Sequence, residues 1–140
     1  MQGMPLDNGL FMPQYIPDHS KIIKGINTLS FQDISFVISK SFLKEDFKSS
    51  EIEDIISESI TFDSPICNIY DNINILELFH GPTLAFKDFG ARFMSRTMEK
   101  TVSGNDKELN ILVATSGDTG SAVAHGFYDV EGINVIILYP

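Results

Sequence analysis

The architecture follows from one stretch, His80-Gly81-Pro82-Thr83-Leu84-Ala85-Phe86-Lys87-Asp88-Phe89-Gly90. It connects a predicted strand over residues 73–79 to a predicted helix over residues 88–98. Residues 84–86 are more apolar than an exposed loop, so we expect this loop to pack against the protein. Lys87 would then be partly desolvated at a helix N-terminus, where the helix dipole disfavours a cation. The pattern favours a neutral amine suited to Schiff-base chemistry, although an exposed structural lysine is also consistent with it.

A second loop, Thr115-Ser116-Gly117-Asp118-Thr119-Gly120, lies between a predicted strand over 109–114 and a predicted helix over 121–128. Hydroxyl groups, glycines and the N–H groups of a helix N-terminus together favour an anion site. The glycine spacing fits neither a P-loop nor a dinucleotide fingerprint, and a tight turn with Asp118 or Thr119 as helix cap is the structural alternative. Ligands bind beyond the carboxyl ends of parallel strands. We therefore expect this loop and Lys87 on one sheet edge, an amine opposite an anion site.

The two halves of the chain differ in pattern. The predicted strands over 73–79, 109–114 and 133–139 alternate with two helices, and a polar turn over 103–106 separates the first helix from the second strand. This β-α-β-α-β order predicts an α/β fold with a parallel open sheet. Because two helices leave sheet faces uncovered, we expect residues 75–140 to be an incomplete domain at the front of a longer protein.

The sequence pattern of residues 1–74 predicts a mostly helical subdomain that begins with a Gly- and Pro-rich arm over residues 1–19. Ser30 and Asp33 cap a first amphipathic helix, and Ser50–Glu53 fits a capping box for a second one that contains Ile52, Ile55 and Ile56. A short strand follows over 66–70. The apolar residues of the arm favour packing against another surface.

The composition narrows the classes of partner. The formal charge is −9, from 10 Lys and Arg against 19 Asp and Glu, and no basic stripe is present. These charges argue against nucleic acid and against an anionic membrane surface. We expect the single cysteine, Cys67, to be a small buried side chain. Because one cysteine cannot form an internal disulfide and no signal-peptide pattern is present, we expect a cytoplasmic protein in a reducing compartment. Neither the acidic helix face nor the three histidines have metal-ligand spacing, so we expect no metal.

The two loops together resemble those of the fold-type II pyridoxal-phosphate enzymes. The motifs are Pro82-Thr83-Leu84-Ala85-Phe86-Lys87-Asp88 and Ala114-Thr115-Ser116-Gly117-Asp118-Thr119-Gly120. More narrowly, residues 76–93, residues 114–128 and the N-terminal Gly9-Leu10-Phe11 with Pro13 are similar to the long bacterial and fungal type of threonine synthase. The likeness is nearly continuous over 75–140 and looser, though collinear, before that.

The resemblance implies a cofactor, pyridoxal 5'-phosphate, and a substrate, O-phospho-L-homoserine. Lys87 would form the Schiff base with the cofactor and move protons at the α and γ-side carbons, with Phe86 and Asp118 beside the cofactor. Thr115, Ser116, Gly117, Asp118 and Thr119 match the loop that holds the substrate carboxylate. Many relatives of the wider class have Asn at the position of Asp118, whereas Asp is usual in the narrower group. The reaction would be O-phospho-L-homoserine plus water giving L-threonine plus phosphate.

One departure from the family pattern qualifies these expectations. The family binds the cofactor phosphate with a later Gly-rich loop, which these 140 residues lack. We therefore expect an N-terminal fragment of a threonine synthase, inactive on its own. A related phospho-lyase that releases 2-oxobutanoate, and a non-catalytic fragment or interaction domain, remain alternatives. Arg92 and Arg96 could contact phosphate, but at one helical turn apart they are also typical of a solvated face.

Overall fold

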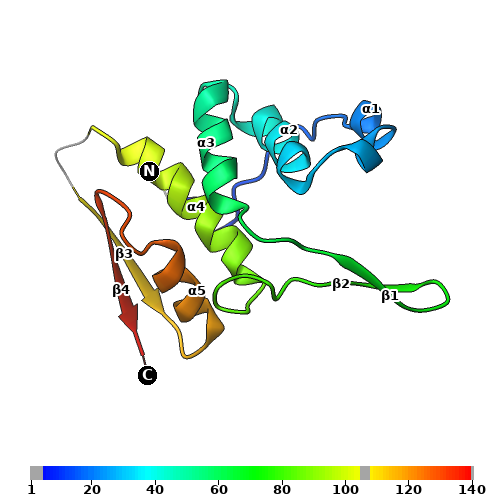
Figure 1. The fold of residues 1–140 in the computed structure, drawn as a ribbon. Helices are drawn as coiled ribbons and strands as arrows, with labels where there is room; N and C mark the ends of the chain where they lie inside the picture. Colours follow the sequence, from blue (N-terminus) through cyan, green and yellow to red (C-terminus); the bar gives the residue numbers. More distant parts are fainter. Residues whose placement is uncertain (1–4, 105–107, 140) are drawn as a thin grey trace.

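The computed structural model describes residues 5–104 and 108–139. Figure 1 shows the arrangement of their helices and strands. In chain order the elements are α1 (Ser20–Ile23), the 3-10 helix η1 (Ile26–Thr28), α2 (Phe31–Leu43), α3 (Ser49–Ser59), β1 (Ile66–Tyr70), β2 (Ile73–Leu76), α4 (Lys87–Val102), β3 (Leu109–Ala114), α5 (Asp118–Gly126) and β4 (Ile133–Leu138). A mixed α/β fold is therefore present, as the sequence predicts.

Helices α2 and α3 pack against each other and, through α3, against α4. The predicted cap of α2 is present: Ser30 Oγ accepts from Asp33 N at 3.1 Å, and Asp33 Oδ2 accepts from Ser30 N at 2.9 Å. The cap of α3 differs from the prediction, because the helix begins at Ser49 and the Glu51 carboxylate accepts from Lys48 N at 2.7 Å. Three isoleucines of this region form a buried cluster with aromatic side chains that include two from α4: Ile52, Ile56 and Ile60, with Phe31, Phe36, Phe47, Phe89 and Phe93.

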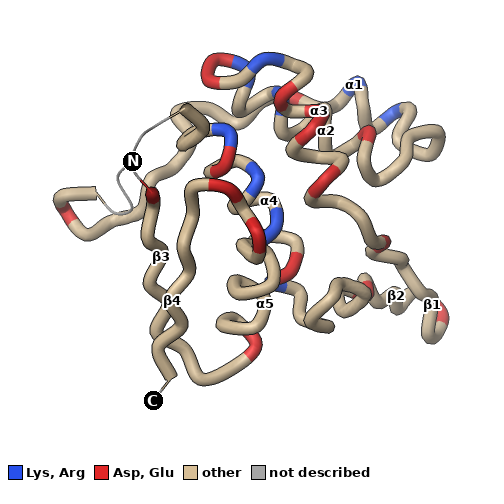
Figure 2. Tube along the Cα trace, turned by 60° about the vertical axis from the view of Figure 1, so that its left-hand side comes forward, with Lys and Arg blue, Asp and Glu red and all other residues tan. Residues whose placement is uncertain are grey.

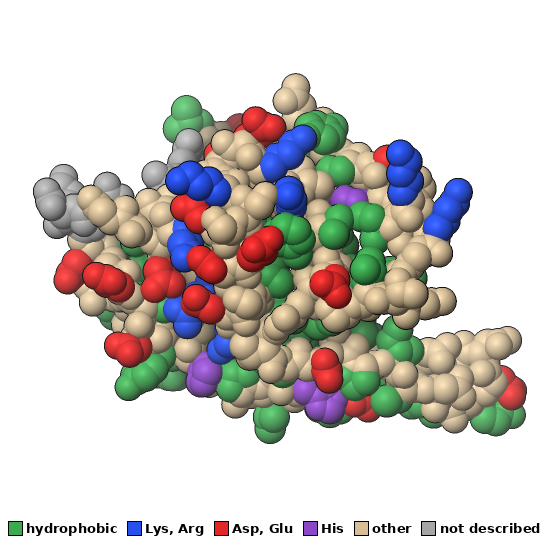
Figure 3. All heavy atoms as spheres, turned by 45° about the horizontal axis from the view of Figure 1, so that its top comes forward, with side chains coloured by type: hydrophobic (Ala, Val, Ile, Leu, Met, Phe, Trp, Pro, Cys, Tyr) green, Lys and Arg blue, Asp and Glu red, His purple; other side chains and the backbone are tan. Residues whose placement is uncertain are grey.

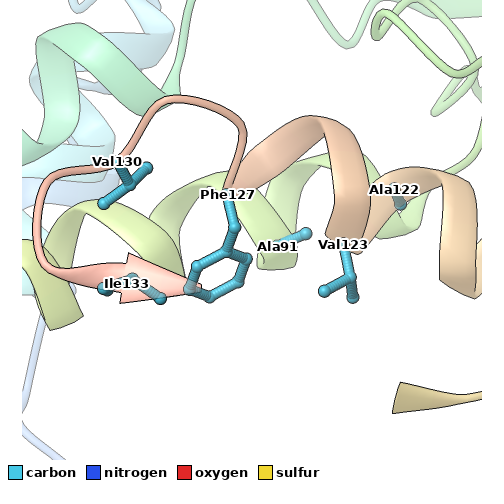
Figure 4. Close-up of a cluster of buried hydrophobic side chains, with 6 residues drawn as sticks. All are labelled: Ala91, Ala122, Val123, Phe127, Val130 and Ile133. Carbon is cyan, nitrogen blue, oxygen red and sulfur yellow. The ribbon is translucent and has the colours of Figure 1, made fainter. Parts of the chain in front are cut away.

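Strands β3 and β4 pair in parallel, and α5 connects them. The register runs from Leu109 opposite Ile133 to Ala114 opposite Leu138. A second buried cluster joins this unit to α4, and Figure 4 shows its side chains between the two helices and the start of β4: Ala91, Ala122, Val123, Phe127, Val130 and Ile133. Because α4 contributes to both clusters, it holds the helical part of the chain against the β3-α5-β4 unit.

The predicted first strand of the parallel sheet pairs differently. β2 ends at Leu76 and pairs with β1 in an antiparallel hairpin, separate from the β3–β4 sheet. Two residues, Asp71 and Asn72, connect the strands, and Asp71 has a φ of 42°. Such a left-handed residue suits a tight hairpin turn, so local pairing forms where the sequence analysis expects a parallel strand. The hairpin extends away from the helices (Figure 1). The division expected between residues 74 and 75 stays a prediction, and its boundary falls inside β2.

Several local expectations need correction. Cys67 is exposed rather than buried, because it lies on the projecting hairpin. The apolar side chains of the N-terminal arm are also exposed; they include Leu6, Leu10 and Ile16. In the predicted polar turn over 103–106, Gly104 has a φ of 81°, while residues 105 and 106 lie outside the described residues. Within the described ranges, no helix is long and apolar enough to cross a membrane.

Candidate active site

The two predicted loops meet at Lys87 and Asp118. Lys87 is the first residue of α4, and Asp118 is the first residue of α5. The Lys87 ammonium donates a hydrogen bond to Asp118 Oδ2 at 2.8 Å. The same Nζ lies 4.6 Å from the centre of the Phe86 ring. The Lys87 side chain is 31% exposed, so it is partly desolvated and remains accessible. The structure therefore brings together three of the residues that the sequence singles out.

Asp118 is charged in this arrangement. The hydrogen bond from Lys87 lowers the pKa of the Asp118 carboxyl below its ordinary value of 3.8, and backbone N–H groups at the start of α5 lower it further. The contact has the geometry of a salt bridge. The neutral amine that the sequence analysis favours stays a prediction.

An apolar groove of about 860 Å³ opens beside Lys87. Its walls come from α2, α3 and α4, with Leu76 from the end of β2, Leu78 from the segment after it, and Thr119 and Val123 from α5. Figure 3 shows hydrophobic side chains in the hollow between the helical part and the extended hairpin. A lysine amine on the wall of an apolar groove can hold a flat, anionic ligand by a polar contact at one point and by apolar contact elsewhere.

The second loop contributes to this site unevenly. Thr119 lines the groove, whereas Ser116 and Gly117 are exposed on the loop before α5. Thr115 is half-buried, and its backbone N–H donates to Leu138 O at 3.1 Å, which extends the β3–β4 pairing. A side chain at Gly120 would bring a Cβ to 2.7 Å from Thr115 Cγ2, so only glycine allows α5 to begin this close to the strand.

The two arginines of α4 have structural partners. Arg92 donates to Glu58 O at 2.7 Å and to Ser59 O at 3.1 Å, which caps the end of α3. Arg96 forms ion pairs with Glu58 at 3.3 Å and with Glu99 at 3.2 Å. Figure 2 shows how the basic residues of α4 lie among acidic ones. The phosphate contact considered for this pair gains no support, because α3 and α4 already use both side chains.

Sequence reasoning did not identify Asp88 as a buried carboxylate that contacts the loop before Lys87. This residue is 1% exposed, and its carboxylate accepts from Thr83 N at 2.9 Å and from Thr83 Oγ1 at 2.6 Å. A usable signal was the position itself: a carboxylate directly after Lys87, in the first turn of a helix whose preceding loop contains a hydroxyl residue.

The residues present fit one end of pyridoxal phosphate. Lys87 offers an amine, Phe86 an adjacent aromatic ring, and the groove an apolar surface of sufficient size for a pyridine ring. The start of α5 offers backbone N–H groups and the Thr119 hydroxyl to an anion. Among the described residues, no group of three or more His, Cys, Asp or Glu side chains is placed to hold a metal ion.

Comparison with known proteins identifies similar sequences and structures. The family described as "Threonine synthase N terminus" matches residues 1–60. Threonine synthase of Haemophilus influenzae is 45% identical over 139 residues, which are 99% of this chain and 32% of that protein. The crystal structure of threonine synthase from Escherichia coli matches with a TM-score of 0.85 and 42% identity, over 99% of this chain and 32% of that chain. A structure of threonine synthase from Brucella melitensis, described as bound to PLP, matches with a TM-score of 0.91 and 30% identity, over 99% and 31%.

The fold is the mixed α/β fold expected from the sequence, and its structural neighbours are threonine synthases. The chain spans about a third of the length of the curated relatives it matches. Within the part that they share, the chain is similar to the N-terminal third of threonine synthases.

Proposed function

We propose that these residues supply the reactive amine and the substrate-carboxylate loop of a pyridoxal-phosphate enzyme. The enzyme converts O-phospho-L-homoserine and water to L-threonine and phosphate. The observation that carries the proposal is the 2.8 Å contact between Asp118 Oδ2 and the Nζ of Lys87, which lines an apolar groove. The similarity to threonine synthases over 99% of the chain supports it.

Each residue of the site has a distinct proposed role. Lys87 holds the cofactor and then takes and returns protons at the substrate α and γ-side carbons. Phe86 and Asp118 lie beside the cofactor, and Asp118 holds Lys87 in place until the cofactor binds. Thr115, Ser116, Gly117, Asp118 and Thr119 surround the substrate carboxylate with N–H and hydroxyl donors. When bound, pyridoxal phosphate supplies the electron sink that this elimination and replacement chemistry needs.

The proposal also covers the organisation of the chain. Residues 1–74 are a helical N-terminal subdomain, and residues 75–140 begin the cofactor-binding domain. A small-molecule substrate is the proposed partner and the cytoplasm the proposed location, consistent with the single, unpaired cysteine. The 140 residues by themselves are proposed to lack activity, because the Gly-rich loop that would bind the cofactor phosphate is not among them.

The test uses the full-length protein that contains these residues. Purified protein is incubated with O-phospho-L-homoserine and pyridoxal phosphate, and threonine, 2-oxobutanoate and phosphate are measured. We expect equal amounts of threonine and phosphate, a visible absorbance band, and loss of both the band and the product in Lys87→Ala. Phosphate release with 2-oxobutanoate would favour the phospho-lyase. Threonine formation that survives in Lys87→Ala would refute the role of Lys87.

A companion measurement addresses the 140 residues alone. The polypeptide is titrated with pyridoxal phosphate, and its absorbance spectrum and threonine formation are followed. We expect weak, non-stoichiometric binding without turnover. Tight stoichiometric binding together with threonine formation would overturn the proposed inactivity. A stable dimer with neither property would instead support an interaction domain, so its size is measured in parallel.

A further inference from the structure

Asp88 is a buried carboxylate without a cationic partner in a salt bridge among the described residues. The salt bridges that the cations of α4 form involve other acids: Asp54, Glu58, Glu99 and Asp118. Burial of a carboxylate is costly unless hydrogen bonds replace the lost water. Both oxygens of Asp88 accept such bonds, and both bonds come from Thr83, in the loop that leads to Lys87.

The loop is folded closely over this carboxylate. At Gly81, a side chain would place a Cβ 2.7 Å from Asp88 Cβ, so the backbone lies against the aspartate and leaves no room for another residue type. Leu84 N donates to Gly81 O at 3.0 Å, which closes the turn. Leu84 itself has a φ of 60°, a left-handed conformation that is uncommon for a residue with a branched side chain. The surrounding contacts must therefore hold this loop in a shape that it would not adopt alone.

The aspartate also fixes the direction of its neighbour. Asp88 and Lys87 are consecutive residues of α4, and successive helical side chains point about 100° apart. When the Asp88 carboxylate is turned inward to Thr83, Lys87 is directed sideways, toward Asp118 and the groove. A change that releases Asp88 from the loop would free the first turn of α4 and, with it, the Lys87 amine.

We propose that Asp88 is a positioning residue for Lys87, which it aims by locking the Gly81–Leu84 turn through Thr83. This inference rests on the proposed function, because it assigns the aim of the amine that holds the cofactor. Asp88 does not touch the cofactor or substrate in this role. Thr83 and Gly81 are its partners: one donates the two hydrogen bonds, and the other provides the space.

The experiment measures cofactor binding by the full-length protein in four variants. Gly81→Ala adds a Cβ against Asp88, Thr83→Val removes the hydroxyl but keeps the shape, and Thr83→Ser restores the hydroxyl. Ser95→Ala is the matched control, since Ser95 is also buried on α4 but, within the part of the chain that the structure describes, its hydroxyl donates only to Arg92 O of its own helix. The readouts are the apparent affinity for pyridoxal phosphate, the visible circular dichroism per bound cofactor, and the lysine that carries the label after borohydride reduction.

Loss of a hydrogen bond to a charged group commonly changes an equilibrium by about tenfold or more. We therefore expect Thr83→Val and Gly81→Ala to weaken cofactor affinity at least about tenfold, to reduce the visible dichroism, and to spread the label beyond Lys87. Thr83→Ser and Ser95→Ala should match the wild type in all three. The conservative rescue by serine separates positioning from general destabilisation, because Thr83→Ser and Thr83→Val are comparably small changes.

Two negative results have different meanings. In the first, the wild type binds pyridoxal phosphate at Lys87, and Thr83→Val and Gly81→Ala bind it equally well with the same dichroism. This result would overturn the positioning role alone. A wild-type protein with no band and no label at Lys87 would overturn the proposed function and this inference together. If Gly81→Ala does not fold, the comparison of Thr83→Val with Thr83→Ser still decides whether the contact between Thr83 and Asp88 positions Lys87.

Discussion

Lys87 and Asp118 form an ion pair across 31 positions of sequence, with Nζ 2.8 Å from Oδ2. Their meeting is a consequence of how α4 and α5 pack. Gly126 of α5 lies against Ala91 of α4, where an added Cβ would fall 3.0 Å from the Ala91 carbonyl carbon. Because this crossing is close, the first residues of the two helices can touch. The geometry of the candidate site therefore depends on a packing contact within the hydrophobic core.

The ion pair predicts a pH-dependent contribution to stability. The pKa of Asp118 is lowered in the folded protein from its ordinary value of 3.8. A lowered carboxyl pKa means that the stabilisation is present above 3.8 and is lost as the pH falls through the lowered value. We expect Asp118→Asn to be slightly less stable than the wild type near neutral pH and equal to it in strong acid. Urea unfolding of cofactor-free protein at both pH values measures this difference.

Salt provides the control for this prediction. Both side chains are partly exposed, so dissolved ions should screen the pair and narrow the difference between wild type and Asp118→Asn. A difference in stability between wild type and Asp118→Asn that is independent of salt, or that grows toward acid, would contradict the prediction. The amide substitution would then act through something other than the lost charge. Thr119→Ser, on the same turn, keeps the carboxylate and should leave the pH profile unchanged.

Arg92 predicts a second effect, on stability rather than on catalysis. Its guanidinium donates to two carbonyl oxygens at the end of α3 and to Thr61 Oγ1 at 3.2 Å. We expect Arg92→Ala to lower the free energy of unfolding by about 2 kcal/mol, as is typical for hydrogen bonds to a charged group. Arg92→Lys should recover less than half of this, because an ammonium cannot reproduce the forked geometry.

The same measurements separate a structural from a catalytic arginine. Arg96→Ala is the matched control, since among the described residues Arg96 pairs with two partly exposed carboxylates, and its loss should cost less than about 1 kcal/mol. Thermal unfolding of the full-length protein gives the stability, and steady-state kinetics gives KM for the phosphorylated substrate. A large rise in KM with no change in stability would return Arg92 to the role of a phosphate ligand.

Sequence patterns predicted most of the local structure because short-range signals determine it. The Ser30–Asp33 cap of α2 and the bounds of β3 need only hydrogen bonds and alternation within a few residues. The pairing of β2 depends on which strand lies beside it, and alternation cannot specify that. One signal was nevertheless present: two turn residues, Asp71 and Asn72, between two β-branched runs are typical of a hairpin.

For the site, the sequence predicted the participants but not the reason for their proximity. Lys87 and Asp118 were expected together because their loops would leave one edge of one sheet. In the structure β2 lies outside the β3–β4 sheet, and the packing of α4 on α5 brings the two residues together. Asp88 could not be recognised as buried from its own type, because most aspartates are exposed. Its burial depends on the fold of the Gly81–Leu84 turn.

The α4–α5 crossing gives a third prediction. In Gly126→Ala the new methyl would lie 3.1 Å from Ala91 Cβ and 3.2 Å from Ala91 O, closer than normal packing allows. Overpacking of this kind costs about 1–3 kcal/mol. We expect a lower melting temperature and, because the helices separate, weaker cofactor binding at Lys87. Thermal unfolding and an absorbance titration measure the two effects.

Gly90→Ala is the matched control for this crossing. Gly90 lies on α4, and an added Cβ there would have no atom within 4 Å from the described residues beyond its own stretch of helix. Since alanine favours a helix over glycine, this variant should be more stable by about 0.5–1 kcal/mol. If Gly126→Ala and Gly90→Ala change stability in the same direction, the close approach of the two helices is not what limits residue 126.

A fourth prediction concerns the exposed thiol on the hairpin. The pKa of Cys67 is raised above its ordinary value of 9.0, chiefly by a hydrogen bond to the Glu77 carboxylate, which also accepts from His80 Nε2 at 2.6 Å. A raised thiol pKa leaves less thiolate at any pH below it, so Cys67 should react slowly with alkylating reagents despite its exposure. We expect Glu77→Ala to accelerate alkylation at mildly alkaline pH.

His80→Ala is the control, because it removes the neighbour of Glu77 but keeps the carboxylate. Alkylation of Cys67 should therefore stay slow in this variant. Equal acceleration in both variants would mean that loosening of the segment after β2, rather than the charge of Glu77, controls the reactivity of Cys67.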